Sequence, residues 1–284
     1  MKRILFLLIV LAAAVCVADE DGASVEIRGA GAIQGEPVLL TLTTDKPAAW
    51  ATATFLGQNL RFDPEDDVLI ALVAVDRNKK PGDYTLDVNV QYADGTKGSF
   101  SKAISVAGKT FPTSQLSVDP RFVTLSKEDL EWVKKDNEAA AKAYASSSEL
   151  RLWHGAWQQP AEGRWSSAFG VRRLFNGEER SYHSGADIAI PTGTPVSCSN
   201  SGRVALVRHM FFGGKTVLVD HGQGVFTGYM HLSEFKVAEG DIVEPGQLIG
   251  ISGSTGRVTG PHLHWMLRIN NIKVNARSLL SMYP

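Results

Sequence analysis

Two short segments of this sequence combine residue types that bind metal ions. His183 and Asp187 lie four residues apart. Gly185 stands between them and permits a tight bend, so we expect the two side chains to converge on one ion. His262 and His264 are separated by one residue, and on a strand two such residues point to the same face. These four side chains are therefore candidates for a metal site.

A fifth candidate, His231, lies in a further strand-like run. Imidazole nitrogens with a carboxylate oxygen suit zinc, and three protein ligands with one open position are typical of a catalytic zinc site. Zinc lowers the pKa of a bound water to about 7, which supplies a nucleophile at neutral pH. Histidines left free can then orient or deprotonate that water and stabilise an oxyanion. Spacing alone leaves a second interpretation open, a β domain with unrelated histidines.

The elements that must position these residues are strands joined by glycine-rich turns. Residues 204–207, 216–219, 225–232 and 263–269 are strand-like and are separated by glycines. Strands and helices do not alternate, which disfavours Rossmann and α/β-barrel folds. We therefore expect a mostly antiparallel β domain over residues 151–284.

The first half of the chain predicts a second β unit. Short strand-like runs with no helical period occupy residues 24–107, a pattern typical of a small antiparallel sandwich. The segment Pro81-Gly82-Asp83-Tyr84 resembles the tyrosine corner of immunoglobulin-like domains. We expect an immunoglobulin-like β-sandwich at residues 19–108. Its acidic cluster at residues 63–67 lacks the pattern of a calcium loop and is predicted to be a solvated turn.

Residues 109–150 are predicted to be a linker that contains a helix. Ser126 is placed to cap this helix, with Asp129 at the third helical position. The alanine-rich body of the helix ends near residues 146–148. The helix is either a connecting arm or a cover that packs on the second domain, and the sequence leaves both open.

The amino-terminal residues resemble an export signal. Two basic residues precede an apolar run that ends at Ala18, shorter than the ~20 residues of a transmembrane helix. We expect residues 1–18 to be removed as a signal peptide, which places the protein in the periplasm or outside the cell. Lipoprotein processing at Cys16 is the alternative, but Val15 before that cysteine disfavours it.

Composition excludes several classes of protein. The 284 residues are 44% hydrophobic and 21% charged, as in globular chains of one or two domains. The 29 basic and 30 acidic residues give a net charge of -1, which gives no support to nucleic-acid binding. Removal of residues 1–18 takes Lys2 and Arg3 and lowers this charge to -3. Cys198 is then the single cysteine, and we expect it to be a small buried residue. No remaining apolar run is long enough to span a membrane.

An ordered series of motifs surrounds the five candidates and resembles one known family. The motifs are Ala168-Phe169-Gly170-Val171-Arg172-Arg173, His183-x-Gly185-x-Asp187, Val217-Leu218-Val219-Asp220-His221-Gly222, Tyr229-Met230-His231-Leu232, Gly253-Ser254-Thr255-Gly256 and Gly260-Pro261-His262-Leu263-His264. From about Ser166 to Ile269 the series resembles the lysostaphin-type zinc metallopeptidases, which are peptidoglycan endopeptidases. Arg173 and Tyr182 lie close to His183 in sequence and are further candidates for substrate contact.

The resemblance implies a role for each of the five residues. It implies that His183, Asp187 and His264 hold Zn²⁺, and that His231 and His262 form the catalytic pair beside the bound water. It also implies a zinc metalloendopeptidase domain at residues 151–284 that hydrolyses peptide cross-links or stem peptides of bacterial peptidoglycan. We expect D-Ala–diaminopimelate cross-links rather than glycine bridges as the substrate, since the chain resembles a periplasmic enzyme without wall-binding repeats.

The alternative is a non-catalytic module that binds peptidoglycan or activates another cell-wall hydrolase. Some relatives of this kind have lost zinc ligands, and the retention of all five positions here favours an enzyme. The chain departs from the family's pattern at Trp265-Met266, where Phe-Glu is common, but neither position is a ligand. The amino-terminal domain is a candidate for contact with a cell-wall protein partner.

Overall fold

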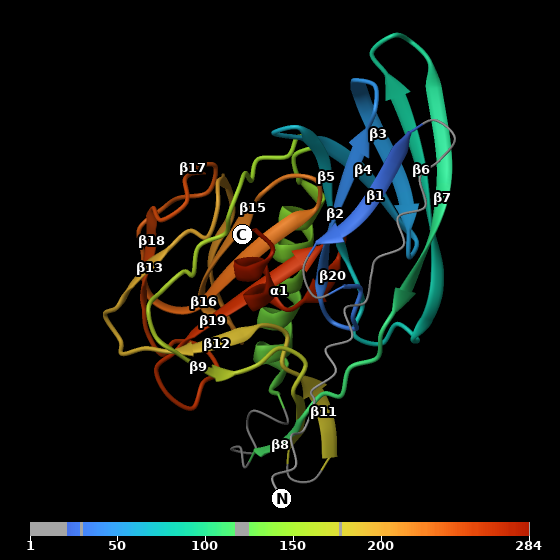
Figure 1. The fold of residues 1–284 in the computed structure, drawn as a ribbon. Coiled ribbons are helices and arrows are strands. Elements are labelled where there is room, and N and C mark those ends of the chain that lie inside the picture. The colour runs from blue at the N-terminus through green and yellow to red at the C-terminus, as the bar shows by residue number, and fades with distance from the viewer. Residues whose placement is uncertain (1–21, 29–30, 117–124, 176–177, 284) are drawn as a thin grey trace, which may run out of the picture.

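The computed structural model describes residues 22–28, 31–116, 125–175 and 178–283. The chain forms two β units, and one long helix lies against the second of them (Figure 1). The prediction of a mostly β protein is therefore confirmed. The expected signal peptide at residues 1–18 lies outside the described residues.

The first unit is a single antiparallel sheet of seven strands. These are β1 (Ala23–Arg28), β2 (Pro37–Thr44), β3 (Ala48–Phe55), β4 (Gln58–Glu65), β5 (Val68–Ala74), β6 (Gly82–Tyr92) and β7 (Lys97–Val106). They pair in the order β1-β2-β5-β4-β3-β6-β7. The first part of β4 pairs with β3 and its last part with β5. Because β4 belongs to both halves, the sheet curls around one core that includes Leu40, Phe55 and Phe62.

The second unit is a larger antiparallel sheet. Its strands are β9 (Arg164–Ser167), β12 (Ala186–Ala189), β13 (Pro195–Ser197), β14 (Gly202–Met210), β15 (Gly214–Asp220), β16 (Val225–Phe235), β17 (Ile242–Val243), β18 (Leu248–Ser252), β19 (Leu263–Ile269) and β20 (Ile272–Val274). The main path runs β17-β14-β15-β16-β19-β12-β9. Strands β16, β19 and β12 are thus neighbours (Figure 1), and the candidate residues lie on or beside them.

A small third sheet connects the linker to the second unit. Strand β10 (Arg172–Phe175) pairs with β11 (Glu178–Tyr182) and, in parallel, with β8 (Thr113–Leu116). Since β11 ends one residue before His183, this sheet holds the segment from which that candidate ligand projects.

The linker helix α1 (Lys127–Ala145) packs on the second sheet and is not a free arm. Its predicted amino-terminal capping box, formed by Ser126 and Asp129, is confirmed. Asp136 is buried and accepts a hydrogen bond of 2.7 Å from Nε of Arg208 on β14. Ala143 packs into an apolar cluster of the sheet. In the ranges that the structure describes, no helix is long and apolar enough to cross a membrane.

The acidic cluster of the first unit takes part in the contact with the second. Glu65 accepts hydrogen bonds from Nη2 of Arg151 at 2.6 Å and from the backbone N–H of Gly155 at 2.8 Å. Asp66 and Asp67 remain exposed. The prediction of a solvated turn is therefore wrong for Glu65, because the carboxylate that faces the second unit finds an arginine there.

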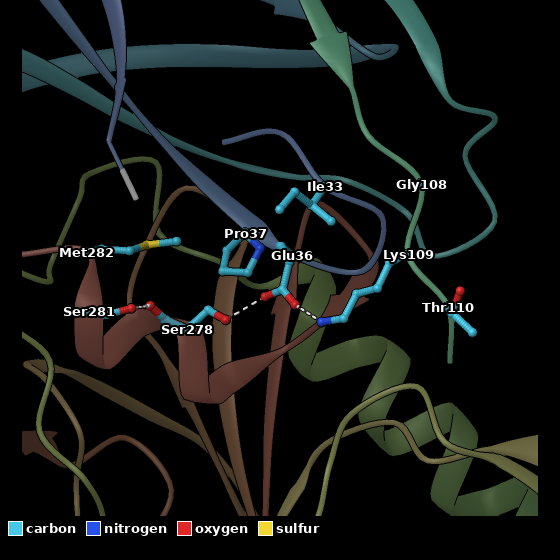
Figure 2. Close-up of a pocket in the computed structure, with 9 residues that line it drawn as sticks. All are labelled: Ile33, Glu36, Pro37, Gly108, Lys109, Thr110, Ser278, Ser281 and Met282. Atoms are coloured by element: carbon cyan, nitrogen blue, oxygen red, sulfur yellow. Dashed lines mark hydrogen bonds and ion pairs between the residues drawn. The ribbon is translucent and has the colours of Figure 1, made fainter. Parts of the chain in front are cut away.

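A second contact between the units is centred on Glu36, whose side chain is buried (Figure 2). Its carboxylate accepts hydrogen bonds from Nζ of Lys109, from Oγ of Ser278 and, at 3.1 Å, from Nδ2 of Asn275. Ser278 belongs to the 3₁₀ helix η2 (Ala276–Ser281) near the end of the chain. Glu36, Lys109 and Ser278 also line a cavity of about 460 Å³. Through these hydrogen bonds one carboxylate joins the first sheet, the linker and the carboxyl-terminal helix.

Replacement of Glu36 by alanine is expected to destabilise the protein by about 2 kcal/mol, because three donors lose their common acceptor at a buried position. Urea unfolding should show a lower midpoint for Glu36→Ala. The matched control is Asp67→Ala, which removes an exposed carboxylate and should change stability by less than about 0.5 kcal/mol. Equal midpoints for the two variants would contradict the assigned role of Glu36.

Candidate metal centre and active site

Three candidate ligands from separate elements meet in the second unit. Asp187 on β12 lies directly opposite His264 on β19, and His183 follows β11. Nε2 of His183, Oδ1 of Asp187 and Nδ1 of His264 are each 2.9 Å from the other two. A tetrahedral zinc ion, with bonds of about 2.0–2.1 Å, requires ligand atoms roughly 3.3 Å apart. This donor set therefore fits a metal ion of that kind after small shifts.

The protonation states of the three side chains suit metal binding. Nδ1 of His183 donates to the carbonyl oxygen of Ala168 at 2.8 Å, which leaves the lone pair on Nε2 directed at the cluster. Burial lowers the pKa of His264 to about 4. Burial raises the pKa of Asp187, but the adjacent rings of His183 and His264 outweigh this effect and hold the pKa well below its usual range. A neutral imidazole and an ionised carboxylate are the forms that bind metals.

Gly185 lies at a bend, as expected, and the structure adds a second reason for a glycine there. Its backbone does not adopt the left-handed conformation that favours glycine. Instead, a Cβ at this position would lie 2.6 Å from Nε2 of His264 and 2.5 Å from the carbonyl oxygen of Trp265. The absence of a side chain thus allows the segment between His183 and Asp187 to pass directly against the ring of the third candidate ligand.

The remaining two candidates, His231 and His262, lie beside the cluster. Their ring centroids are 4.7 Å apart, and the ring of His231 is 6.0 Å from that of His264. Nδ1 of His231 donates to the carbonyl oxygen of Thr255 and Nδ1 of His262 to that of Gly260, each at 2.9 Å. Both rings therefore carry their free lone pair on Nε2. Burial, reinforced by the neighbouring imidazoles, lowers the pKa of His231 to about 3.

His231 has an unusual backbone conformation, with φ of +65°. Its N–H donates to the carbonyl oxygen of Gly213 at 2.8 Å, and the pairing between β15 and β16 shifts register between Lys215 and Val217. Such irregularities bend a strand and redirect a side chain, and a non-glycine residue at positive φ costs about 1–3 kcal/mol. The sequence motif located His231 but gave no sign of this backbone distortion.

The two further candidates for substrate contact have different surroundings. Arg173 lies at the cluster, with Nη2 3.9 Å from Oδ2 of Asp187. The ring of Tyr182 instead packs under the guanidinium of Arg77, at 4.5 Å, in a contact with the first unit. The structure therefore places Arg173 beside the candidate ligands and assigns Tyr182 a packing contact.

The other three histidines lie outside the cluster. His154 and His209 are exposed, and His221 is fully buried. Cys198 is also fully buried, as expected, and burial raises the pKa of its thiol to about 11. At this pKa the thiol is protonated and is a poor metal ligand.

His221 gives the second unit a predictable dependence on pH. Nδ1 donates to the carbonyl oxygen of Ser201 and Nε2 accepts from Oγ1 of Thr227, both at 2.7 Å. Burial lowers its pKa from 6.5 to about 4, so between these values the unfolded chain binds the proton and the folded chain does not. The free energy of unfolding therefore depends on pH through His221. It has its full value above pH 6.5 and falls by about 3 kcal/mol as the pH falls towards 4.

In His221→Gln the side chain keeps a donor and an acceptor but does not titrate, so this loss should disappear. Urea unfolding of both proteins with a chelator present, at pH 7, 5.5 and 4, measures the effect. The difference in unfolding free energy between the two proteins should shrink by about 3 kcal/mol from pH 7 to pH 4. A constant difference across these pH values would contradict the assignment.

Comparison with known proteins agrees with this geometry. The model of peptidase family M23 matches residues 181–276. A peptidoglycan DD-endopeptidase of Vibrio cholerae, ShyA, is 45% identical over 120 residues, which are 41% of this chain and 28% of that protein. A DD-carboxypeptidase/endopeptidase of Neisseria meningitidis, Mpg, is 45% identical over 121 residues, or 43% of this chain and 28% of that protein. The matches thus span little more than a quarter of each relative.

A solved structure is similar over both units. A peptidase M23 from Pseudomonas aeruginosa superposes with a TM-score of 0.67 and 28% sequence identity, and the match covers 88% of this chain and 96% of that one. The matched family segment, residues 181–276, contains all five candidate residues. Residues 181–276, in the second half of the chain, therefore form a domain of peptidase family M23.

Proposed function

We propose that this protein is a zinc-dependent endopeptidase that hydrolyses peptide cross-links or stem peptides of bacterial peptidoglycan. The observation that carries the proposal is the triangle of donor atoms from His183, Asp187 and His264, each 2.9 Å from the other two. The name of the Vibrio relative supports peptidoglycan as the substrate. The names of both relatives, which contain the term DD, support a bond between two D-residues as the target.

Each of the five residues has a role in this proposal. His183, Asp187 and His264 would hold the zinc, which as a Lewis acid polarises the scissile carbonyl group and acidifies water. Nε2 of His231 and Nε2 of His262 face the same space. There they take up the proton of the attacking water, pass it to the leaving amine and hydrogen-bond to the developing oxyanion. Burial of the site keeps these interactions in a medium of low polarity, where they are stronger than in water.

The direct test is digestion of purified peptidoglycan by the full chain, with release of soluble muropeptides as the readout. We expect release to stop in a chelator and to return on addition of zinc. His264→Ala should bind no zinc and release nothing. Full activity of His264→Ala without zinc would overturn the assignment. No release by zinc-loaded protein alone, but enhanced release on addition of a cell-wall amidase, would favour the non-catalytic alternative.

We also propose that the protein is exported and acts in the periplasm or outside the cell. The basic and apolar composition of residues 1–18 supports export. The proposed substrate, peptidoglycan, also supports it, because peptidoglycan lies outside the cytoplasmic membrane. We propose three segments: an immunoglobulin-like domain at residues 19–108, a linker with its helix at 109–150 and the metalloendopeptidase domain at 151–284. Cell fractionation tests the location, and a chain that begins near Leu150 tests whether the second unit is active alone.

For the first unit we propose an immunoglobulin-like fold and contact with a cell-wall protein. Oη of Tyr84 donates to the carbonyl oxygen of Lys80 at 2.8 Å, the hydrogen bond expected of a tyrosine corner. Trp50 on β3 is 46% exposed, and exposed aromatic side chains are enriched at protein interfaces. Loss of binding to cell-wall proteins in Trp50→Ala, with unchanged hydrolysis, would support this role.

A further inference from the structure

Both the backbone and the ring of His231 are held by carbonyl groups of nearby loops. A left-handed conformation is unfavourable for a residue other than glycine, and it persists where surrounding contacts fix it. The N–H of His231 donates to the carbonyl oxygen of Gly213, and Nδ1 donates to the carbonyl oxygen of Thr255. The carbonyl of Thr255 therefore sets the direction of the ring and leaves the lone pair on Nε2.

Strand β16 changes its pairing at His231. On one edge it pairs with β19 as far as Met230 and with β18 from Leu232 onward. On the other edge its register with β15 shifts next to the pair Lys215–Leu232. His231 thus lies between paired stretches on both edges of its own strand, so contacts from outside the strand are needed to fix it.

The side chain of Thr255 supplies a link at this irregular point. Thr255 lies in the loop between β18 and β19. Its Oγ1 accepts a hydrogen bond from the N–H of Lys215 on β15 at 2.9 Å and donates one to the carbonyl oxygen of Leu232 on β16 at 2.7 Å. Because Lys215 and Leu232 are paired across the two strands, one hydroxyl joins both strands beside His231 and anchors the loop to them.

Close packing also restricts the backbone of Thr255. A Cβ at Gly214 would overlap the carbonyl group and Oγ1 of Thr255, and a Cβ at Gly256 would overlap the backbone of Gly214. Both glycines have positive φ, so the two segments approach each other where only glycine fits. The carbonyl groups of Gly213 and Thr255, which hold His231, therefore belong to segments that pack directly together.

We propose that Thr255 is a positioning residue for His231. Its hydroxyl, through Lys215 and Leu232, fixes the backbone carbonyl that accepts from Nδ1 of His231, and this keeps Nε2 free and in place. The inference rests on the proposed function, in which Nε2 takes up a proton and passes it on. Thr255 acts only through His231, so its replacement should leave zinc binding intact.

The first test is the variant Thr255→Val, which removes the hydroxyl and keeps the branched shape of the side chain. With cross-linked muropeptides and the zinc-loaded full chain, kcat should fall by about 10–100-fold, as expected for a misplaced catalytic group. KM should stay within about threefold, and zinc content should not change. Thr255→Ser restores the hydroxyl and should reach the kcat of the wild type within about threefold.

Thr194→Val is the matched control. Oγ1 of Thr194 also donates to a backbone carbonyl oxygen, that of Pro191 at 2.9 Å, in another turn of the second unit. Its removal should leave kcat unchanged. An unchanged kcat in Thr255→Val, no rescue by Thr255→Ser, or loss of zinc from Thr255→Val would overturn the inference.

A double variant separates positioning of His231 from general distortion of the site. In His231→Ala the ring that Thr255 holds is absent, so the addition of Thr255→Val should slow hydrolysis by less than about twofold more. A general distortion would instead multiply the two losses, and that result would contradict the assigned role of Thr255.

The tautomer of His231 is a readout that needs no turnover. Nitrogen NMR of the zinc-loaded protein distinguishes a proton on Nδ1 from one on Nε2, and the absence of signals in His231→Ala assigns those of His231. The wild type and Thr255→Ser should show the Nδ1–H form alone, and Thr255→Val should show both forms. If the wild type hydrolyses nothing, the proposed function fails and the NMR result still decides the inference. Equal His231 signals in the wild type and Thr255→Val would overturn it.

Discussion

His231→Ala is expected to slow peptidoglycan hydrolysis by a factor of about 10²–10⁴ while the protein keeps its zinc. The side chain is outside the triangle of donor atoms, but its ring is 4.7 Å from that of His262. Its Nδ1 is occupied by the carbonyl oxygen of Thr255, so Nε2 is the atom that can accept a proton. Steady-state rates on cross-linked muropeptides, with metal content measured on the same samples, check the prediction.

Two variants separate the chemistry of His231 from its backbone conformation. His231→Gly also removes the imidazole, but glycine adopts φ of +65° without strain. It should therefore be as inactive as His231→Ala and more stable by about 1 kcal/mol in urea. His209→Ala removes an exposed histidine and should keep full activity. Loss of zinc from His231→Ala would instead make His231 a ligand, and an unchanged rate would exclude it from proton transfer.

The five candidates could be found from sequence because their chemistry is local. A histidine and an aspartate four apart, and two histidines two apart, are visible without any knowledge of the fold, and the surrounding motifs supply the order. The capping box of α1 is local for the same reason, since Ser126 and Asp129 satisfy each other within one turn. The mostly β architecture follows from alternation and glycine-rich turns, which are also short-range patterns.

Other features depend on which strands become neighbours, and no short pattern contains that information. The pairing of Asp187 with His264 joins residues 77 positions apart, and only this register makes Gly185 a contact of the His264 ring. Glu65 binds Arg151 through a contact between the two units. The left-handed backbone of His231 likewise results from the shifted pairing of β15 and β16. In each case the residue type was visible, but its partner was set by long-range packing.

Gly185→Ala is expected to weaken zinc binding by at least about 100-fold and to abolish hydrolysis, although it adds a single methyl group. The new Cβ would lie 2.6 Å from Nε2 and 2.8 Å from Cε1 of His264, and 2.5 Å from the carbonyl oxygen of Trp265. The carbonyl belongs to the β12–β19 pairing and cannot move independently, so the imidazole must shift. Loss of the contacts that orient a metal ligand costs about 10–100-fold in metal affinity, and displacement of the ligand itself costs at least as much. Competition with a chromophoric chelator measures the affinity for zinc directly.

A matched glycine variant shows whether this loss comes from the site or from general destabilisation. Gly240 has φ of +94° and open space around its Cβ position, so Gly240→Ala strains the backbone without a steric clash. It should lower stability by about 1 kcal/mol and leave the affinity for zinc unchanged. If both variants lost zinc equally, backbone stability would explain the effect. If Gly185→Ala bound zinc as the wild type does, the ring of His264 would have room to move without losing its place as a ligand, and close packing against Gly185 would not be what orients it.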